Sequence, residues 1–198
     1  MLVRHGRPAA AGADDPDPGL TAQGRAQAEA VAARLARERV DALYSSTQRR
    51  ALETVEPLVR LTGLPLTADE ALCEFDRDVG GYVPLEEAGG DPQQRWQDLR
   101  RGLWNGRRFD LHAFRDRVVT ALDAVVAAHA GERVVVACHG GVVNAYAGHV
   151  LGVAEPFFFQ PAYTGTTVVR ASRGGHREVA VLNDSCHLDA LADVASPT

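Results

Sequence analysis

The chain has 198 residues, of which 45% are hydrophobic and 24% are charged, and its formal net charge is -5. This composition is typical of a globular protein, and the length predicts one domain over residues 1–198. The sequence shows no basic cluster, no apolar run of membrane-spanning length and no signal-peptide pattern, so we expect no nucleic-acid or membrane partner and a cytoplasmic location. Three widely spaced cysteines predict buried reduced thiols, not disulfides or a zinc site.

The first half of the chain alternates short apolar segments with amphipathic ones. Residues 2–4 predict a short strand, and the Pro- and Gly-rich residues 7–19 predict a loop. The segment LTAQGRAQAEAVAARL predicts a helix with Thr21 as its N-cap. Residues 41–46 predict a second strand, TQRRALETVEPLVRLTG predicts a helix that ends at Gly63, and LPLTADEAL suits a third strand.

Residues 76–110 are rich in Gly, Asp, Gln and Arg and predict an insertion that forms a small lid. Residues 111–129 then predict an amphipathic helix, 133–138 a strand buried on both faces, and GGVVNAYAGHVLG a helix that begins directly after His139. TTVVRAS and REVAVLN predict a hairpin. This order predicts an α/β protein, a three-layer α/β/α sandwich with a mostly parallel central sheet.

Two histidines directly follow predicted strands and precede glycine, in RHG and CHGG. Ligands of such sheets bind at the carboxyl ends of the strands, so we expect His5 and His139 to reach the same edge. Because glycine has no Cβ, Gly6, Gly140 and Gly141 would let backbone amides approach a ligand closely.

Arginines gather at the same edge. Arg4 precedes the first histidine, and SSTQRRALET places Arg49 and Arg50 in the first turn of a helix. We expect these arginines, the two histidines and the exposed helix N-termini to form an anion-binding pocket. Of the possible anions, a phosphoryl group suits guanidinium and amide donors best.

The chemistry of phosphoryl transfer then assigns two roles. A neutral imidazole can attack phosphorus, and the resulting phosphoramidate is reactive enough for water to release it, so His5 is the predicted nucleophile. The leaving alkoxide needs a proton, and ALCEFDRD offers Glu74, Asp76 and Asp78 as donors.

A metal site is the alternative for the same residues, because His5, His139 and a carboxylate could form a facial triad. Arg4 and Arg50 in the same pocket would repel a divalent cation. We therefore predict no metal and no cofactor.

These segments together resemble the histidine phosphatase superfamily, the phosphoglycerate-mutase-like proteins. The matching stretches are LVRHG, LTAQGRAQA, SSTQRRALET, LCE, VVACHGG and LNDSCHL, which follow the family's order over nearly the whole chain. The resemblance implies that His5 is phosphorylated, that Arg4, Arg50 and His139 hold the phosphate, and that Glu74 donates the proton.

The chain departs from the family's pattern in several places. FDRDVGGYVPLEE replaces an F-G-x-W-E-G-like stretch that often follows the acid, so Asp76 stays open as the donor beside Glu74. RHGRPAA lacks the acidic residue and the asparagine found after RHG in many relatives, and Cys138 replaces the commoner serine. The strand before RHG is short for the family, which leaves open a native start upstream of Met1.

The segment PFFFQPAYTG holds three consecutive phenylalanines that cannot all share one face. Either two fill the core and one lies at a surface, or the stretch forms an apolar wall for the non-phosphate part of a substrate. We predict a substrate rim that contains Phe157, Phe158 and Tyr82. Trp96 and Trp104 allow the same two interpretations, and Tyr163 could offer its hydroxyl to a substrate.

We predict a metal-independent phosphomonoesterase that hydrolyses a small phosphorylated metabolite through a phosphohistidine on His5, as a monomer or homodimer. Hydrolysis is favoured over transfer because the lid is short and the chain is smaller than typical mutases of the family. A phosphoglycerate-type mutase is the alternative enzyme. A catalytically weak phospho-ligand-binding domain is the alternative outside the enzymes.

Overall fold

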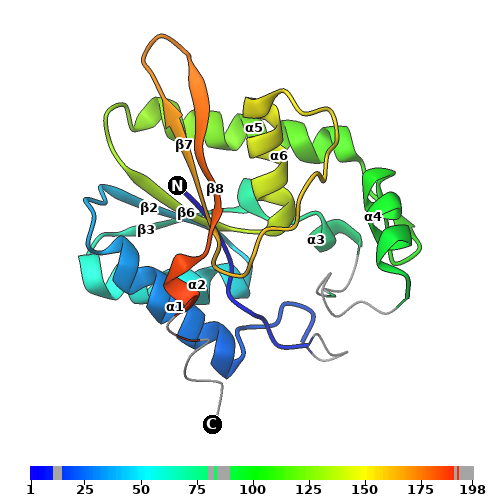
Figure 1. Cartoon of the computed structure of the whole chain (residues 1–198), viewed down its shortest axis with the longest axis horizontal. Helices are drawn as coiled ribbons and strands as arrows, with labels where there is room; N and C mark the ends of the chain where they lie inside the picture. Colours follow the sequence, from blue (N-terminus) through cyan, green and yellow to red (C-terminus); the bar gives the residue numbers. More distant parts are fainter. Residues whose placement is uncertain (11–14, 80–82, 84–89, 190, 192–198) are drawn as a thin grey trace.

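The computed structural model describes residues 1–10, 15–79, 83, 90–189 and 191. Its main strands are β1 (Leu2–Arg4), β2 (Ala42–Ser46), β3 (Leu66–Asp69), β6 (Val134–Cys138), β7 (Thr166–Ala171) and β8 (Arg177–Asp184). They form a central six-stranded sheet with the order β3-β2-β6-β1-β7-β8 (Figure 1). The first four strands of this order run parallel, and β7 and β8 extend the sheet in antiparallel fashion.

Helices cover both faces of the sheet (Figure 1). On one face lie α1 (Ala22–Leu35) and α2 (Arg49–Thr62), and on the other lie α5 (Leu111–Ala128) and α6 (Gly140–Leu151). The resulting three-layer α/β/α arrangement confirms the predicted fold class and the predicted order of strands and helices.

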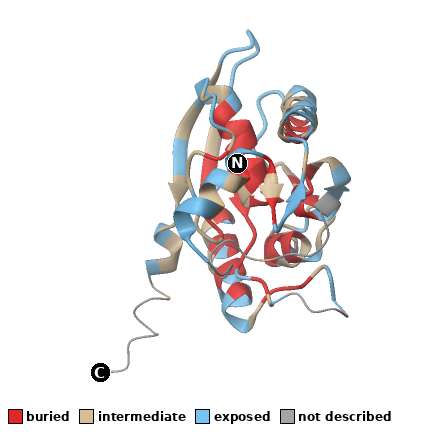
Figure 2. Cartoon of the chain, turned by 90° about the vertical axis from the view of Figure 1, so that its right-hand side faces the viewer, coloured by how far each residue is buried: buried red, intermediate tan, exposed pale blue. Residues whose placement is uncertain are grey.

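Strand β6 contributes to both hydrophobic cores because successive side chains of a strand point to opposite faces. Val135 and Ala137 pack in the core beneath α1 and α2, whereas Val136 and Cys138 pack in the core beneath α5 and α6. Figure 2 shows the buried residues concentrated in the sheet and on the helix surfaces that face it. The apolar run VVVAC is thus buried on both sides, as the sequence predicted.

Local signals set the ends of the helices. The hydroxyl of Thr21 accepts a hydrogen bond from the N–H of Gly24 at 3.0 Å and caps α1. Gly63 ends α2 in the left-handed region, with a φ of 69°. Helix α6 begins directly after His139, so its N-terminus lies at the carboxyl edge of the sheet.

The segment 76–110 contains α3 (Asp76–Val79), α4 (Pro92–Arg100) and a hairpin of β4 (Leu103–Trp104) and β5 (Arg107–Arg108). The hairpin turns at Asn105 and Gly106, which both adopt positive φ, as a two-residue hairpin turn prefers. Short 3₁₀ turns follow β3 and β8, namely η1 (Glu70–Leu72) and η2 (Cys186–Leu188).

The thiol prediction holds for two of the three cysteines. Cys73 and Cys138 are buried, but Cys186 is exposed because it lies in a surface turn after the last strand. Within the described ranges, no helix has both the length and the apolar character that crossing a bilayer requires.

Candidate active site

The carboxyl ends of β1 and β6 lie side by side at one edge of the sheet. The two strands pair in parallel with Arg4 opposite Cys138, so the residues that follow them are neighbours. The ring centroids of His5 and His139 lie 5.2 Å apart. The structure thus brings together the two histidines that the sequence placed at this edge.

His5 is buried, with 2% of its surface exposed. Its Nδ1 lies 2.8 Å from the carbonyl oxygen of Gly6, which can only accept a hydrogen bond. Nδ1 therefore carries the proton, and Nε2 is the unprotonated nitrogen of the ring. Burial, and then the positive charges of Arg50 and Arg4, lower the pKa of His5 well below 6.5, so the imidazole is neutral at physiological pH.

Arg4 is held in place from two sides. Its Nη1 donates a hydrogen bond to the carbonyl oxygen of Pro161 at 2.5 Å, and its guanidinium group lies 4.2 Å from the ring centre of Tyr163. Stacking on an aromatic face fixes the plane of a guanidinium group and leaves its charge in the pocket. Tyr163, considered from the sequence only for its hydroxyl, therefore positions Arg4.

Arg50 lies in the first turn of α2 and is fully buried. Its Nη2 donates to both carboxylate oxygens of Asp76, at 2.9 and 3.2 Å, and the amide of Gln48 donates to the same carboxylate at 3.0 Å. Asp76 is thus the ion-pair partner of Arg50.

Glu74 has a different environment. Burial, and then the negative charge of Asp76, raise the pKa of the Glu74 carboxyl from 4.5 to about 7. The N–H of Gly141 donates to its Oε2 at 2.7 Å, and the N–H of Phe75 donates to its Oε1 at 3.2 Å. A fixed carboxyl group with this pKa can give and take a proton near neutral pH.

His139 caps the N-terminus of α6 and is fully buried. Its Nε2 lies 2.8 Å from the hydroxyl of Ser46, at the end of β2, and burial followed by the charge of Arg50 lowers its pKa well below 6.5. In the described part of the chain its Nδ1 has no hydrogen-bond partner, and no three histidine, cysteine or carboxylate side chains there are grouped to hold a metal ion.

Gly6 and Gly141 are needed for packing, and not for the expected close approach of backbone amides to a ligand. A Cβ at Gly6 would lie 2.6 Å from the carbonyl oxygen of Gly24, so α1 packs directly on the RHG backbone. A Cβ at Gly141 would lie 2.2 Å from Oε1 of Glu74, whose other oxygen accepts from the Gly141 amide. The two glycines therefore leave space for helix α1 and for the Glu74 carboxyl group, respectively.

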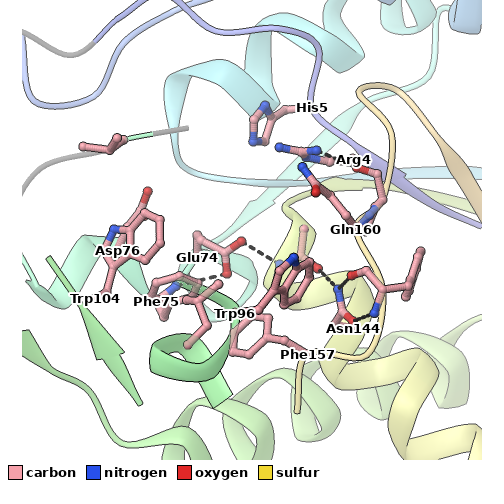
Figure 3. Close-up of a pocket in the computed structure, with 16 residues that line it drawn as sticks. Arg4, His5, Glu74, Phe75, Asp76, Trp96, Trp104, Asn144, Phe157 and Gln160 are labelled. Carbon is pink, nitrogen blue, oxygen red and sulfur yellow. Dashed lines mark hydrogen bonds between the residues drawn. The ribbon is translucent and has the colours of Figure 1, made fainter. Parts of the chain in front are cut away.

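A cavity of about 540 Å³, including its open mouth, adjoins these groups (Figure 3). Arg4, His5, Glu74, Asp76, Gly140 and Gly141 line one part of it. Arg50 and His139 are not among its lining residues. They lie behind that layer, against Asp76 and His5 respectively.

Of the described residues predicted for the substrate rim, one lies in the cavity lining and one does not. Phe157 lines the cavity, but Phe158 does not, because its ring lies over Gly148 of α6. Phe159 takes that place in the lining, since consecutive residues of this loop point in different directions. Tyr82 lies outside the described residues.

Asn144 is a site residue that the sequence analysis missed. Its amide donates to the carbonyl oxygens of Gly140 and Phe159 and accepts from the backbone N–H groups of Phe158 and Phe159. It thereby ties the loop after α6 to the start of that helix. A lone amide within the apolar run GGVVNAYA was the available signal, because a buried polar side chain must find partners.

A model of the histidine phosphatase superfamily (branch 1) matches residues 1–185. Phosphoglycerate mutase-like protein 4 of Arabidopsis thaliana is 34% identical over 131 residues, which cover 63% of this chain and 57% of that protein. The metal-independent phosphoserine phosphatase of the same plant is 34% identical over 161 residues, which cover 73% of this chain and 65% of that protein. The match spans less than two thirds of either relative.

Among solved structures, a phosphoserine phosphatase variant from Entamoeba histolytica in complex with phosphoserine has the same fold. It superposes with a TM-score of 0.74 over 94% of this chain and 97% of that one, at 22% identity. The family match extends over nearly all the elements that build the site. The chain belongs to the histidine phosphatase superfamily.

Proposed function

We propose that this protein hydrolyses small phosphate monoesters through a phosphohistidine on His5, without a metal ion or cofactor. One observation carries the proposal: a neutral, buried imidazole shares a cavity with Arg4 and with a carboxyl group, Glu74, whose pKa is about 7. The names of the relatives, which include a metal-independent phosphoserine phosphatase, support phosphoric monoester hydrolysis.

In the first step, the lone pair of His5 Nε2 attacks phosphorus and the bond from phosphorus to the ester oxygen breaks. The leaving alkoxide takes the proton of Glu74 and departs as an alcohol. The hydrogen bond from Nδ1 to the carbonyl of Gly6 keeps the ring in the tautomer that leaves Nε2 unprotonated.

In the second step, Glu74 is a carboxylate and accepts a proton from water as the water oxygen attacks phosphorus. The bond from phosphorus to Nε2 breaks, inorganic phosphate leaves, and His5 returns to its neutral form. One carboxyl group thus acts as acid and then as base, which a pKa near neutrality favours.

Positive charge stabilises the transferring group. We assign phosphate binding to Arg4, Arg50, His139 and Gly140, because the two guanidinium groups and the N-terminus of α6 surround the position of His5. A bound phosphate dianion also adds negative charge beside Glu74. This charge raises the pKa of the carboxyl further and keeps the acid protonated when substrate is bound.

Three further assignments complete the proposal. Residues 76–110 act as the lid of a single domain, because Trp96, Leu99 and Trp104 from this insertion line the cavity. The protein works in the cytoplasm on a small phosphorylated substrate. It does so as a monomer or homodimer.

The test is phosphate release from p-nitrophenyl phosphate with and without excess EDTA. We expect the rate to change less than about two-fold, because the charges that stabilise the transition state belong to arginines. A rate that collapses in EDTA and returns with Mg²⁺ would contradict the metal-free mechanism. Transfer of phosphate between carbons of phosphoglycerate with little release would identify the mutase, and tight phosphate binding without turnover would identify the binding domain.

Gly141→Ala tests the placement of the acid. The new methyl group would lie 2.2 Å from Glu74 Oε1, so we expect the carboxyl to move and kcat/KM for an alkyl phosphate to fall about 100-fold. Gly148→Ala is the matched control in the same helix, since its Cβ would meet nothing nearer than the ring of Phe158 at 3.4 Å and the carbonyl oxygen of Val153 at 3.8 Å. Full activity of Gly141→Ala would show that catalysis does not depend on the position that the Glu74 carboxyl group takes beside Gly141.

A further inference from the structure

Beyond the phosphate-binding groups, the cavity becomes an apolar recess. Its wall consists of Phe75, Trp96, Leu99, Trp104, Phe157 and Phe159. Glu74 lines the same cavity as His5 and the two indoles (Figure 3), so the proposed acid adjoins both the recess and the reacting groups. The part of a monoester that leaves as an alcohol is next to the acid, and it must therefore occupy this recess.

Among the described residues, the recess offers no cation to a carboxylate on the leaving group. The chain has no lysine, all of its 21 arginines are at described positions, and of these only Arg4 lines the cavity, where it belongs to the phosphate end. Gln160 directly precedes Pro161, whose carbonyl oxygen accepts from Arg4, so it lines that same end (Figure 3). Asp76, the other charged side chain among the described lining residues, already pairs with Arg50 and would repel a carboxylate.

The other side-chain amide of the lining, that of Asn144, already has hydrogen-bond partners. Asn144 donates both of its hydrogens and accepts two hydrogen bonds, all with backbone groups. A carboxylate group in the recess would lose its water without gaining a cation among the described residues, which is costly.

One donor in this wall lacks an acceptor. Trp104 is 5% exposed, and its Nε1 is buried without a hydrogen-bond partner among the described residues. Phe75 holds the indole by an edge-to-face contact with ring centres 5.9 Å apart, so the ring has little freedom to turn toward water. A buried N–H without a partner is a cost that a bound acceptor would remove.

We propose that the recess selects monoesters of uncharged, apolar alcohols of about the size of a benzyl group, and that the Trp104 N–H donates a hydrogen bond to an uncharged acceptor on the leaving group. The inference rests on the proposed function. It makes Trp104 a specificity-determining residue.

The first test compares benzyl phosphate with O-phosphoserine, which both release a primary alcohol. We expect kcat/KM to be about 100-fold higher for benzyl phosphate, because phosphoserine brings a carboxylate group into a recess whose described residues offer it no cation. Equal or faster hydrolysis of phosphoserine would overturn the proposal. Absence of phosphate release from both esters and from p-nitrophenyl phosphate would instead overturn the proposed function.

The second test replaces a CH of the benzyl ring by nitrogen, which adds an acceptor without changing the shape. At pH 8, where pyridine is uncharged, we expect one of the ortho, meta or para pyridylmethyl phosphates to exceed benzyl phosphate about five-fold in kcat/KM. Wild-type protein suffices for this comparison. If no isomer exceeds benzyl phosphate, Trp104 is not a donor to the substrate.

Trp104→Phe then removes the N–H and keeps an aromatic ring. We expect the ratio between the best pyridylmethyl ester and benzyl phosphate to fall to about one. Trp96→Phe is the matched control, since Trp96 lines the same recess but is only half-buried, and it should keep the wild-type ratio. An unchanged ratio in Trp104→Phe, or an equal loss in Trp96→Phe, would overturn the assignment.

Discussion

His5→Ala should lower kcat/KM for p-nitrophenyl phosphate at least about 10,000-fold while the protein stays folded. The variant loses the only nitrogen proposed to bond to phosphorus, but it retains Arg4 and Arg50, so substrate should still bind. Initial rates of phosphate release measure the loss, and circular dichroism checks the fold.

Trapping the intermediate makes this test more specific. Wild-type protein quenched in alkali after mixing with radiolabelled substrate should carry label that is stable in base and lost in acid, as expected of a phosphoramidate, and His5→Ala should carry none. His129→Ala is the control, because His129 pairs with Tyr44 and Glu132, away from the cavity. Unlabelled wild-type protein, or a variant within ten-fold of its activity, would reject the phosphohistidine route.

Glu74→Gln should lower kcat/KM about 1,000-fold for an alkyl phosphate and only about ten-fold for p-nitrophenyl phosphate. An alkoxide is a poor leaving group without a proton, whereas p-nitrophenolate leaves readily as an anion. The measurement is the ratio of the two rate constants in wild type and variant. Equal losses on both substrates would show that Glu74 does not protonate the leaving group, and Asp76→Asn would then be tested in the same way.

The pH dependence follows from the same carboxyl group. The first step needs protonated Glu74, so for an alkyl phosphate kcat/KM should decline as pH rises through about 7. His5 contributes no acidic limb near neutrality, because its pKa lies well below 6.5 and the neutral ring is the nucleophile. The decline should vanish in Glu74→Gln. A decline that persists there belongs to another group.

Much of the fold follows from local patterns. The run VVVAC could only be a strand buried on both faces, and Thr21 and Gly63 mark helix ends because capping and left-handed backbone depend on the residue itself. The loop at residues 156–161 was harder to predict. Its path depends on Asn144, twelve or more residues earlier, so the choice between Phe158 and Phe159 as lining residues had no local signal.

By itself the sequence determined the alternation of strands and helices, and with it the edge where His5 and His139 meet, because residues that directly follow parallel strands share one end of the sheet. Only the tertiary structure distinguishes the environments of Glu74 and Asp76. The two carboxyl groups are two residues apart, alike in chemistry and both buried, yet Asp76 pairs with Arg50 whereas Glu74 accepts from backbone N–H groups and has a raised pKa. A carboxyl group's protonation depends on burial and on charges that distant segments bring to it, and a linear pattern does not contain that information.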